Sequence, residues 1–220
     1  TECEDDELQE YAETVLENAD HAVELTTSAR EMADVMLSAE EELEQVGLRS
    51  VLENEIQEVQ SAYSDAEVTR TTPVPPVSVQ ANSMLNSVFR NLLKNAIQHN
   101  DKAVPEVDVS TTDRDDTVVV RVADNGPGVP EDQKDAIFGK GEKGLDSHGT
   151  GIGLYLVKTL VESYQGDIWV EDRAPSDLEG GRSGTDDGAD RTTPRDGHET
   201  VDDGREGAVF VVELPKVELN

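Results

Sequence analysis

The sequence predicts an α+β fold, a two-layer α/β sandwich in which helices cover one face of a sheet, preceded by a long helix. Two observations predict this class. Apolar residues recur at helical spacing in some segments and alternate with polar residues in others, and the two kinds of segment follow one another along the 220 residues. Neighbouring candidate strands are also separated by short, turn-rich stretches, as in hairpins.

The first element is a long helix over residues 1–45, a stretch without Gly or Pro. Its apolar and small residues alternate spacings of four and three, which is the heptad pattern of a coiled coil or helix bundle. They are Leu8, Ala12, Val15, Ala19, Ala22, Thr26, Ala29, Ala33 and Met36. The helix could pack on its own domain, but its length and acidic outer face favour a dimer bundle.

The second domain is predicted over residues 46–220. After a break at Gly47, a helix has the apolar face Leu48, Val51, Leu52, Ile56 and Val59. Two short strands, around Val68 and around Val77 and Val79, flank a proline-rich turn. A helix over about 83–98, strands over 107–110 and 117–123, a glycine-rich stretch over 126–149, a helix over 152–164 and strands over 167–170 and 208–214 complete the order.

Residues 171–206 differ from everything around them. These 36 positions contain twelve acidic residues, five arginines and six glycines, with few apolar residues. Such a composition buries too little surface to offset the entropy of ordering. We therefore expect an acidic, Gly-rich, disordered insertion between the last two strands.

The composition excludes several functions. With 18 basic and 49 acidic residues, the net charge is −31. This charge excludes a basic surface that binds nucleic acid and a polybasic segment that binds anionic lipid. No apolar run approaches the ~20 residues that span a bilayer. A single cysteine, Cys3, permits no internal disulfide and suits the cytoplasm. Because the chain has no initiating Met or leader, we expect it to be a fragment of a longer soluble assembly.

The scarcity of lysine, seven residues against 49 carboxylates, resembles that of proteins from salt-loving organisms. Their acidic surfaces stay hydrated in molar salt, where a Debye length of ~3 Å screens the self-repulsion.

Four stretches could carry chemistry. In the first, Asn91, Asn95 and His99 are spaced four apart near the end of a helix and share one face, although this could be an ordinary exposed polar face. Asn oxygens suit Mg²⁺. In the second, Asp124 follows a strand, where its carboxylate could accept from an amino group such as that of adenine, with Gly126 and Gly128 beside it. Asp-Asn-Gly is also a common turn.

The third stretch, residues 149–157, is a glycine-rich loop that opens a helix, so its backbone N–H groups and the helix dipole could cradle phosphate. Its G-x-G-x-G pattern is neither the Rossmann fingerprint nor a Walker motif. The fourth stretch, residues 137–141, lies between the second and third, in a predicted lid.

In this order and spacing, the four stretches resemble the N, G1, F and G2 boxes of sensor histidine kinases. The resemblance is to their ATP-binding catalytic domain, within the superfamily of gyrase, Hsp90-type, histidine kinase and MutL ATP-binding domains. Residues 91–100 match the N box, 124–128 the G1 box, 137–138 the F box and 149–154 the G2 box. The resemblance runs over about residues 46–170, resumes at the last strand, and implies the Bergerat-type ATP-binding fold.

The resemblance implies a role for each matching residue. Asn95 would bind Mg²⁺, and Asp124 would bind the adenine amino group. Asn91 is the candidate catalytic residue, at a place where ATP-hydrolysing members have a glutamate base; an amide cannot act as that base, which favours phosphoryl transfer over rapid hydrolysis. The remaining residues of the implied ATP pocket are His99, Asn100, Gly126, Gly128, Val129, Phe138, Lys140, Gly141, Gly149, Thr150, Gly151, Ile152, Gly153 and Leu154.

Two features depart from the family pattern. Gln98 stands where many relatives have a phosphate-contacting Lys or Arg, so Lys140 or Lys143 would substitute. Residues 1–45 resemble the second helix of the dimerisation and phosphoacceptor hairpin, whose first helix carries the H box and is absent. His21 lacks the H-box context and is interpreted as an ordinary surface histidine.

The resemblance therefore implies a cytoplasmic kinase module of a two-component system that uses ATP and Mg²⁺. It would transfer the γ-phosphoryl group to a histidine outside this chain, for relay to a response-regulator aspartate. A homodimer would form through the first helix, without nucleic-acid or membrane contact. The alternatives are a serine kinase of the anti-sigma type, which usually lacks such a helix, and a regulatory nucleotide-binding module without transfer activity.

Overall fold

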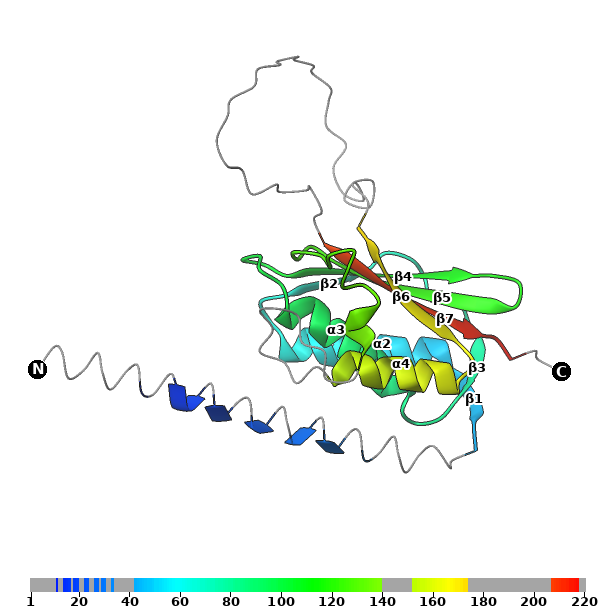
Figure 1. Cartoon of the computed structure of the whole chain (residues 1–220). Coiled ribbons are helices and arrows are strands. Elements are labelled where there is room, and N and C mark those ends of the chain that lie inside the picture. The colour runs from blue at the N-terminus through cyan, green and yellow to red at the C-terminus, as the bar shows by residue number, and fades with distance from the viewer. Residues whose placement is uncertain are drawn as a thin grey trace, which may run out of the picture.

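A computed structural model describes residues 42–139, 152–173 and 207–217. It also describes thirteen positions between residues 11 and 33, all of them helical and exposed (Figure 1). The expectation of a helix is confirmed at these positions. Because none of them is buried, the folded domain does not cover the predicted heptad pattern there.

The main sheet has five strands in the order β2-β4-β5-β7-β6. Every neighbouring pair is antiparallel except β2 and β4, which run parallel. The strands are β2 (Glu67–Arg70), β4 (Glu106–Asp113), β5 (Thr117–Asp124), β6 (Asp167–Asp172) and β7 (Ala208–Pro215). Each contains or overlaps a predicted strand.

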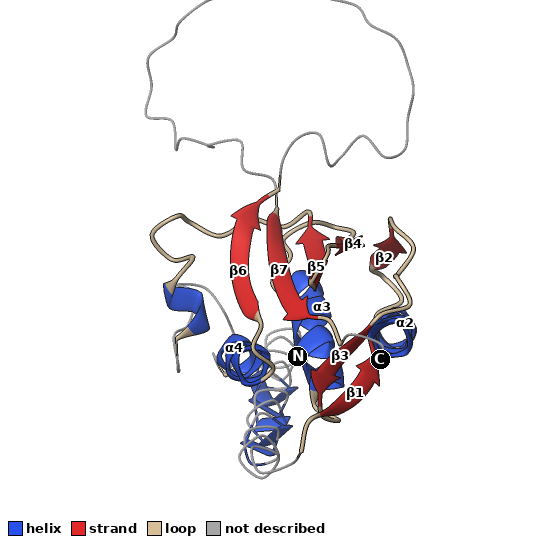
Figure 2. Cartoon of the chain, turned by 90° about the vertical axis from the view of Figure 1, so that its right-hand side faces the viewer, coloured by secondary structure: helices blue, strands red, loops and turns tan. Residues whose placement is uncertain are grey.

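Three helices cover one face of this sheet, which confirms the two-layer architecture (Figures 1 and 2). They are α2 (Leu48–Ala62), α3 (Leu85–Gln98) and α4 (Gly153–Ser163), and a short 3₁₀ helix, η1, spans Ala136–Phe138. The apolar face predicted for α2 is buried at all five positions. In α2, Glu55 is also buried, and the Arg90 guanidinium of α3 donates to both of its carboxylate oxygens at 3.0 Å.

A second, small sheet was not predicted. Strand β1 (Glu44–Gly47) pairs antiparallel with β3 (Ser78–Ala81), and the chain after β7 bridges to β3 at Lys216. The prediction of a helix through residue 45 is therefore wrong at its end, since residues 42 and 43 are not helical and residues 44 and 45 are in β1. Pairing with Ala81 and Gln80 of β3, rather than local helix propensity, decides the conformation of residues 44 and 45.

The opposite face of the main sheet has no described helix on it (Figure 1). It carries a small apolar cluster of Val119, Ala123, Val209 and Val211, with Trp169 packed against it. An ion pair also lies on this face. The Arg121 guanidinium on β5 reaches across β7 to Glu171 on β6 at 2.6 Å, and the Glu171 carboxylate also accepts from the Trp169 indole.

The predicted insertion begins three residues too early. Glu171 and Asp172 belong to β6, and Arg173 is buried, so the predicted boundary at residue 171 is wrong. The cause is tertiary, because these polar residues pair with the start of β7 in the register Asp172 with Ala208. Residues 174–206 lie outside the described part of the chain.

Candidate functional site

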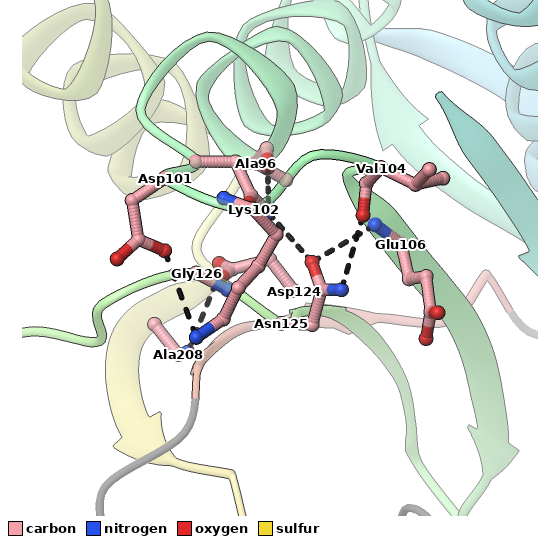
Figure 3. A network of polar contacts seen from close by, with 10 residues as sticks. Ala96, Asp101, Lys102, Val104, Glu106, Asp124, Asn125, Gly126 and Ala208 are labelled. Atoms are coloured by element: carbon pink, nitrogen blue, oxygen red, sulfur yellow. Dashed lines mark hydrogen bonds and ion pairs between the residues drawn. The ribbon is translucent and has the colours of Figure 1, made fainter. Parts of the chain in front are cut away.

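Asp124 ends β5 with its side chain buried, as a functional carboxylate at a strand end would require. One of its oxygens, Oδ1, accepts hydrogen bonds from the backbone N–H groups of Gly126 at 2.9 Å and Ala208 at 3.2 Å (Figure 3). No described residue donates to the other oxygen, Oδ2. Two backbone contacts thus fix the rotamer and leave one acceptor for a ligand.

Burial raises the pKa of Asp124 above its ordinary value of 3.8. The two backbone N–H groups and the nearby Arg173 charge favour the ionised form and oppose this shift, while Asp101 adds to it. A buried carboxylate with a raised pKa at the end of a strand is a typical feature of a functional site.

A pair of asparagines joins the end of α3 to the segment after β5. The Asn125 Oδ1 accepts from the Asn100 side chain at 2.8 Å and from the Glu106 N–H at 2.9 Å, and the Asn125 Nδ2 donates to the Val104 carbonyl. The Asn100 Nδ2 also donates to the Ala96 carbonyl at 3.2 Å (Figure 3). Through these hydrogen bonds, Asn100 links the end of α3 to the segment that follows β5.

Glycines line the remaining side of Asp124. Gly207 has φ +95°, and a Cβ built on it would lie 1.9 Å from the Asp124 carbonyl oxygen. Gly128 lies against the Gly207 carbonyl, while Gly126 lies against Asn100. The start of β7 therefore forms one wall of the site, 83 residues away from Asp124 in the sequence.

The three residues of the polar face predicted for α3 differ in their exposure to solvent. Asn91 and Asn95 are half-buried, and the Asn91 Nδ2 donates to the Ser87 carbonyl at 2.8 Å. His99 is exposed at the end of the helix. Gln98 is also exposed, and its Nε2 donates to the Tyr63 hydroxyl at 3.1 Å, so its amide is engaged on the α2 side.

The beginning of α4 lies against α3. A Cβ on Gly153 would lie 2.9 Å from the Asn91 Oδ1, so the two boxes are in contact. Val129 and Leu154 pack against the core, and Ile152 is half-buried. Phe138 is buried, with its ring edge-on to Phe210 at 6.4 Å between centroids, so it is largely a core residue.

Five predicted site residues, Lys140, Gly141, Gly149, Thr150 and Gly151, lie outside the described residues, as does Lys143. The structure adds three residues that the sequence did not indicate, Arg173, Gly207 and Ala208. It also gives a contact role to Asn125, which lies in the predicted 124–128 stretch but had no predicted role of its own. The other three reach the site through the pairing of β6 with β7, which has no local signal.

Three further observations limit what the described residues can do. They contain no group of three or more His, Cys, Asp or Glu side chains that could hold a metal. None of their helices combines the length and apolarity needed to cross a membrane. A groove of about 530 Å³ between α2 and α3, lined by Asn54, Gln57, Glu58, Ser61, Ala62 and Asn86, contains none of the predicted site residues.

Residues 81–218 match the family model of histidine kinase-, DNA gyrase B- and HSP90-like ATPases. Cyanobacterial phytochrome A of Nostoc is 32% identical over 113 residues, which is 50% of this chain and 14% of that protein. The adaptive-response sensory kinase SasA of Synechocystis is 30% identical over 121 residues, 52% of this chain and 31% of that protein. The chain thus spans less than a third of each relative's length.

Solved structures share the fold. The mycobacterial sensor histidine kinase MprB superposes with a TM-score of 0.61 at 22% identity, covering 80% of this chain and 99% of that one. A structure of the histidine kinase ThkA in complex with the response regulator TrrA gives a TM-score of 0.54 at 20% identity, covering 89% and 49%.

Proposed function

We propose a specific activity for this chain, which belongs to the family of histidine kinase-, DNA gyrase B- and HSP90-like ATPases and has their ATP-binding domain. The activity is that of the kinase module of a two-component sensor histidine kinase. It would transfer the γ-phosphoryl group of ATP to a histidine outside these 220 residues, from which a response-regulator aspartate would receive it. The kinase relatives and the kinase structures support this choice within the family.

The observation that carries the proposal is the environment of Asp124. Its Oδ1 is held by two backbone N–H groups, so Oδ2 can accept a hydrogen bond from an exocyclic amino group such as that of adenine. The half-buried Asn91 and Asn95 lie on α3, beside the start of α4. The base would bind at the strand end, and the phosphates near α3 and α4.

The residues present fit a magnesium ion. No described residue forms a side-chain hydrogen bond with Asn95, and its amide oxygen is a hard neutral ligand of the kind Mg²⁺ accepts. Mg²⁺ usually keeps several waters and takes few protein ligands, so one amide and the substrate phosphates suffice. When bound, the ion would neutralise charge on the phosphates.

Asn91 sets the expected reaction type. Its amide cannot take a proton from water, and its Nδ2 is already bonded to the Ser87 carbonyl. Hydrolysis of ATP should therefore be slow. Transfer should require an acceptor imidazole positioned in line with the γ-phosphate, since positioning and charge stabilisation supply most of the catalysis.

The helical positions before residue 34 support a homodimer through the segment that precedes β1, the proposed second helix of a phosphoacceptor-type hairpin. The side chains of Tyr11, Val15, Leu16 and Val23 are all more than 60% exposed. The described positions of the predicted heptad pattern are exposed as well, namely Val15, Ala19, Ala22, Thr26, Ala29 and Ala33. A heptad seam that its own domain leaves uncovered favours a partner helix. We assign the chain from β1 onward to the catalytic domain, because residues 44 and 45 pair with β3, and we propose that this domain works in the cytoplasm.

The decisive experiment combines radiolabelled γ-phosphate ATP with this chain and separate acceptors, in molar KCl. Alone, the chain should bind Mg·ATP and remain unlabelled. Adding an H-box helix in trans should give acid-labile, alkali-stable label on that helix. Phosphoserine on a protein acceptor would instead support the anti-sigma type of kinase, and no label on any acceptor would support a regulatory module. Stoichiometric acid-labile label on the chain itself would contradict the proposal and point to His21.

The acid excess supports a further proposal, that the chain is adapted to high salt. The net charge of −31 disfavours the compact state at low ionic strength and is screened at ~1 M salt. Circular dichroism should show folding that strengthens as KCl is added. Full folding at low salt with no gain from KCl would contradict it.

A further inference from the structure

Arg173 is a buried cation that the family boxes do not include. It follows β6, and only about 2% of its side chain is exposed. Its Nη2 pairs with the Asp108 carboxylate on β4, three strands away in the sheet order. The side chain therefore crosses the ends of β7 and β5, directly behind the Asp124 site.

Along this path Arg173 contacts the start of β7. The side-chain Cδ of Arg173 would lie 3.2 Å from a Cβ on Gly207, so the stem of the side chain lies against this glycine. The backbone N–H of residue 173 also donates to the Gly207 carbonyl at 3.3 Å, a main-chain bond that does not depend on the arginine side chain. Gly207 in turn touches the Asp124 carbonyl, and the next residue, Ala208, donates its N–H to the Asp124 Oδ1. Gly207 and Ala208 thus lie between Arg173 and Asp124.

The cation is costly for folding, which argues against a purely structural role. The Nε and Nη1 atoms are buried, and no described residue accepts a hydrogen bond from them. A buried polar group without a partner destabilises a fold, and replacing a whole buried ion pair by apolar residues is often neutral or stabilising. The charge is therefore expected to serve the site, where it favours the ionised form of Asp124.

We infer that Arg173 is a positioning residue for base recognition, which holds Gly207 and Ala208 against Asp124 and keeps that carboxylate ready to accept from an exocyclic amino group. The inference rests on the proposed binding of ATP at this site. It assigns discrimination for the amino group to a residue that does not itself touch the base.

The test compares the full chain with three variants, using calorimetric titration of Mg·ATP and Mg·ITP, since ITP carries a carbonyl in place of the 6-amino group. Arg173→Met removes the guanidinium group with its charge. Asp108→Asn keeps the guanidinium but removes the carboxylate that pairs with it. Because the Asp108 side chain is 29% exposed, this second variant can be tested even if Arg173→Met does not fold. Arg121→Met is the matched control, because it removes another ion pair on the same sheet face without a contact to Asp124.

The wild type should prefer ATP. In Arg173→Met the affinity for ATP should fall about tenfold, the scale of one misplaced hydrogen bond, with ITP affinity almost unchanged. Asp108→Asn should lower the ATP-to-ITP ratio less, and Arg121→Met should leave it unchanged. The urea midpoint of Arg173→Met should fall only slightly, because the Asp108 carboxylate left without its partner is 29% exposed and keeps contact with water. A small change in stability beside a loss of ATP affinity of about tenfold separates positioning from structural support.

The pH dependence gives a second readout. ATP affinity should decline on acidification as Asp124 becomes protonated, and in Arg173→Met the decline should begin at higher pH. The Arg173 charge opposes protonation; the remaining facing groups are Asp101, which favours protonation, and the two backbone N–H groups, which oppose it. An unchanged ATP-to-ITP ratio in both Arg173→Met and Asp108→Asn would overturn the inference alone. A wild type that does not prefer ATP would overturn the proposed base site and this inference with it.

Discussion

The two ends of the proposed nucleotide site are built in different ways. At the strand end, Asp124 and Asn125 are fixed by hydrogen bonds from residues distant in the sequence. At the helical end, Asn91 bonds only within its own helix among the described residues, and Asn95 forms no side-chain bond with them. The strand end is thus organised before a ligand arrives, whereas the helical end offers groups that a metal and phosphates would complete.

The largest effect is expected from Gly207→Ala at the strand end. A Cβ there would collide with the Asp124 carbonyl, and φ of +95° is strained for alanine. We expect a loss of about 2–4 kcal/mol of unfolding free energy and a large loss of ATP affinity. Gly47→Ala is the control, because its Cβ would meet only the Ser50 hydroxyl at 3.6 Å. If both variants changed the urea unfolding free energy equally, the close contact between Gly207 and the Asp124 carbonyl would be contradicted.

Asp124→Asn should separate binding from stability. ATP affinity should fall by about 1–3 kcal/mol, because an amide can present an N–H where the adenine amine needs an acceptor. A fluorescent ATP analogue in titration measures the loss. Wild-type affinity in the variant would contradict the G1 assignment.

The same variant should be more stable than the wild type at neutral pH. Burial raises the folded-state pKa of Asp124, so its contribution to stability is greatest below pH 3.8 and declines as pH rises through that folded-state pKa. The neutral amide of the variant avoids this loss of stability. The difference in unfolding free energy between the variant and the wild type should therefore shrink as the pH is lowered. Asp115→Asn, in an exposed turn, is the control in urea unfolding across pH.

At the helical end, Asn95→Ala should have a smaller effect that is specific to the metal. Deleting the proposed protein ligand should flatten the dependence of ATP binding on Mg²⁺, with little change in its absence. Asn86→Ala, on the same helix but in the groove toward α2, controls for helix effects. Superimposable Mg²⁺ titrations of Asn95→Ala and wild type would contradict the N-box assignment.

The smallest effect is expected from replacing residues 174–206 by Gly-Asn. Arg173 and Gly207 already bond across the end of the β6–β7 pair, so a two-residue turn could close the hairpin. ATP affinity should stay within about twofold, because the deleted residues are too polar to contribute much to a core. Loss of folding would show that the segment is structural. A longer deletion that also removes residues 171–173 should bind ATP more weakly, since it removes Arg173.

The sequence by itself determined the helices and most strands. Periodicity predicted α2 with all five buried positions, and the hairpin of β4 and β5, because a local pattern reports which face of an element is buried. The order of four short boxes identified the family. Local pattern also places Asn91 and Asn95 on one face of α3, because two residues four positions apart lie on the same side of a helix.

Only the tertiary structure decided the surroundings of Asp124. Its two backbone donors, the collision that restricts residue 207 to glycine, and the guanidinium behind them depend on which strands pair and in what register. The same holds for β1, where a helical pattern gives way to a strand because β3 lies beside it. The physical reason is that every residue except proline offers the same backbone N–H and C=O groups, whatever its side chain. The sequence therefore does not predict which N–H of a distant strand will face a given carboxylate.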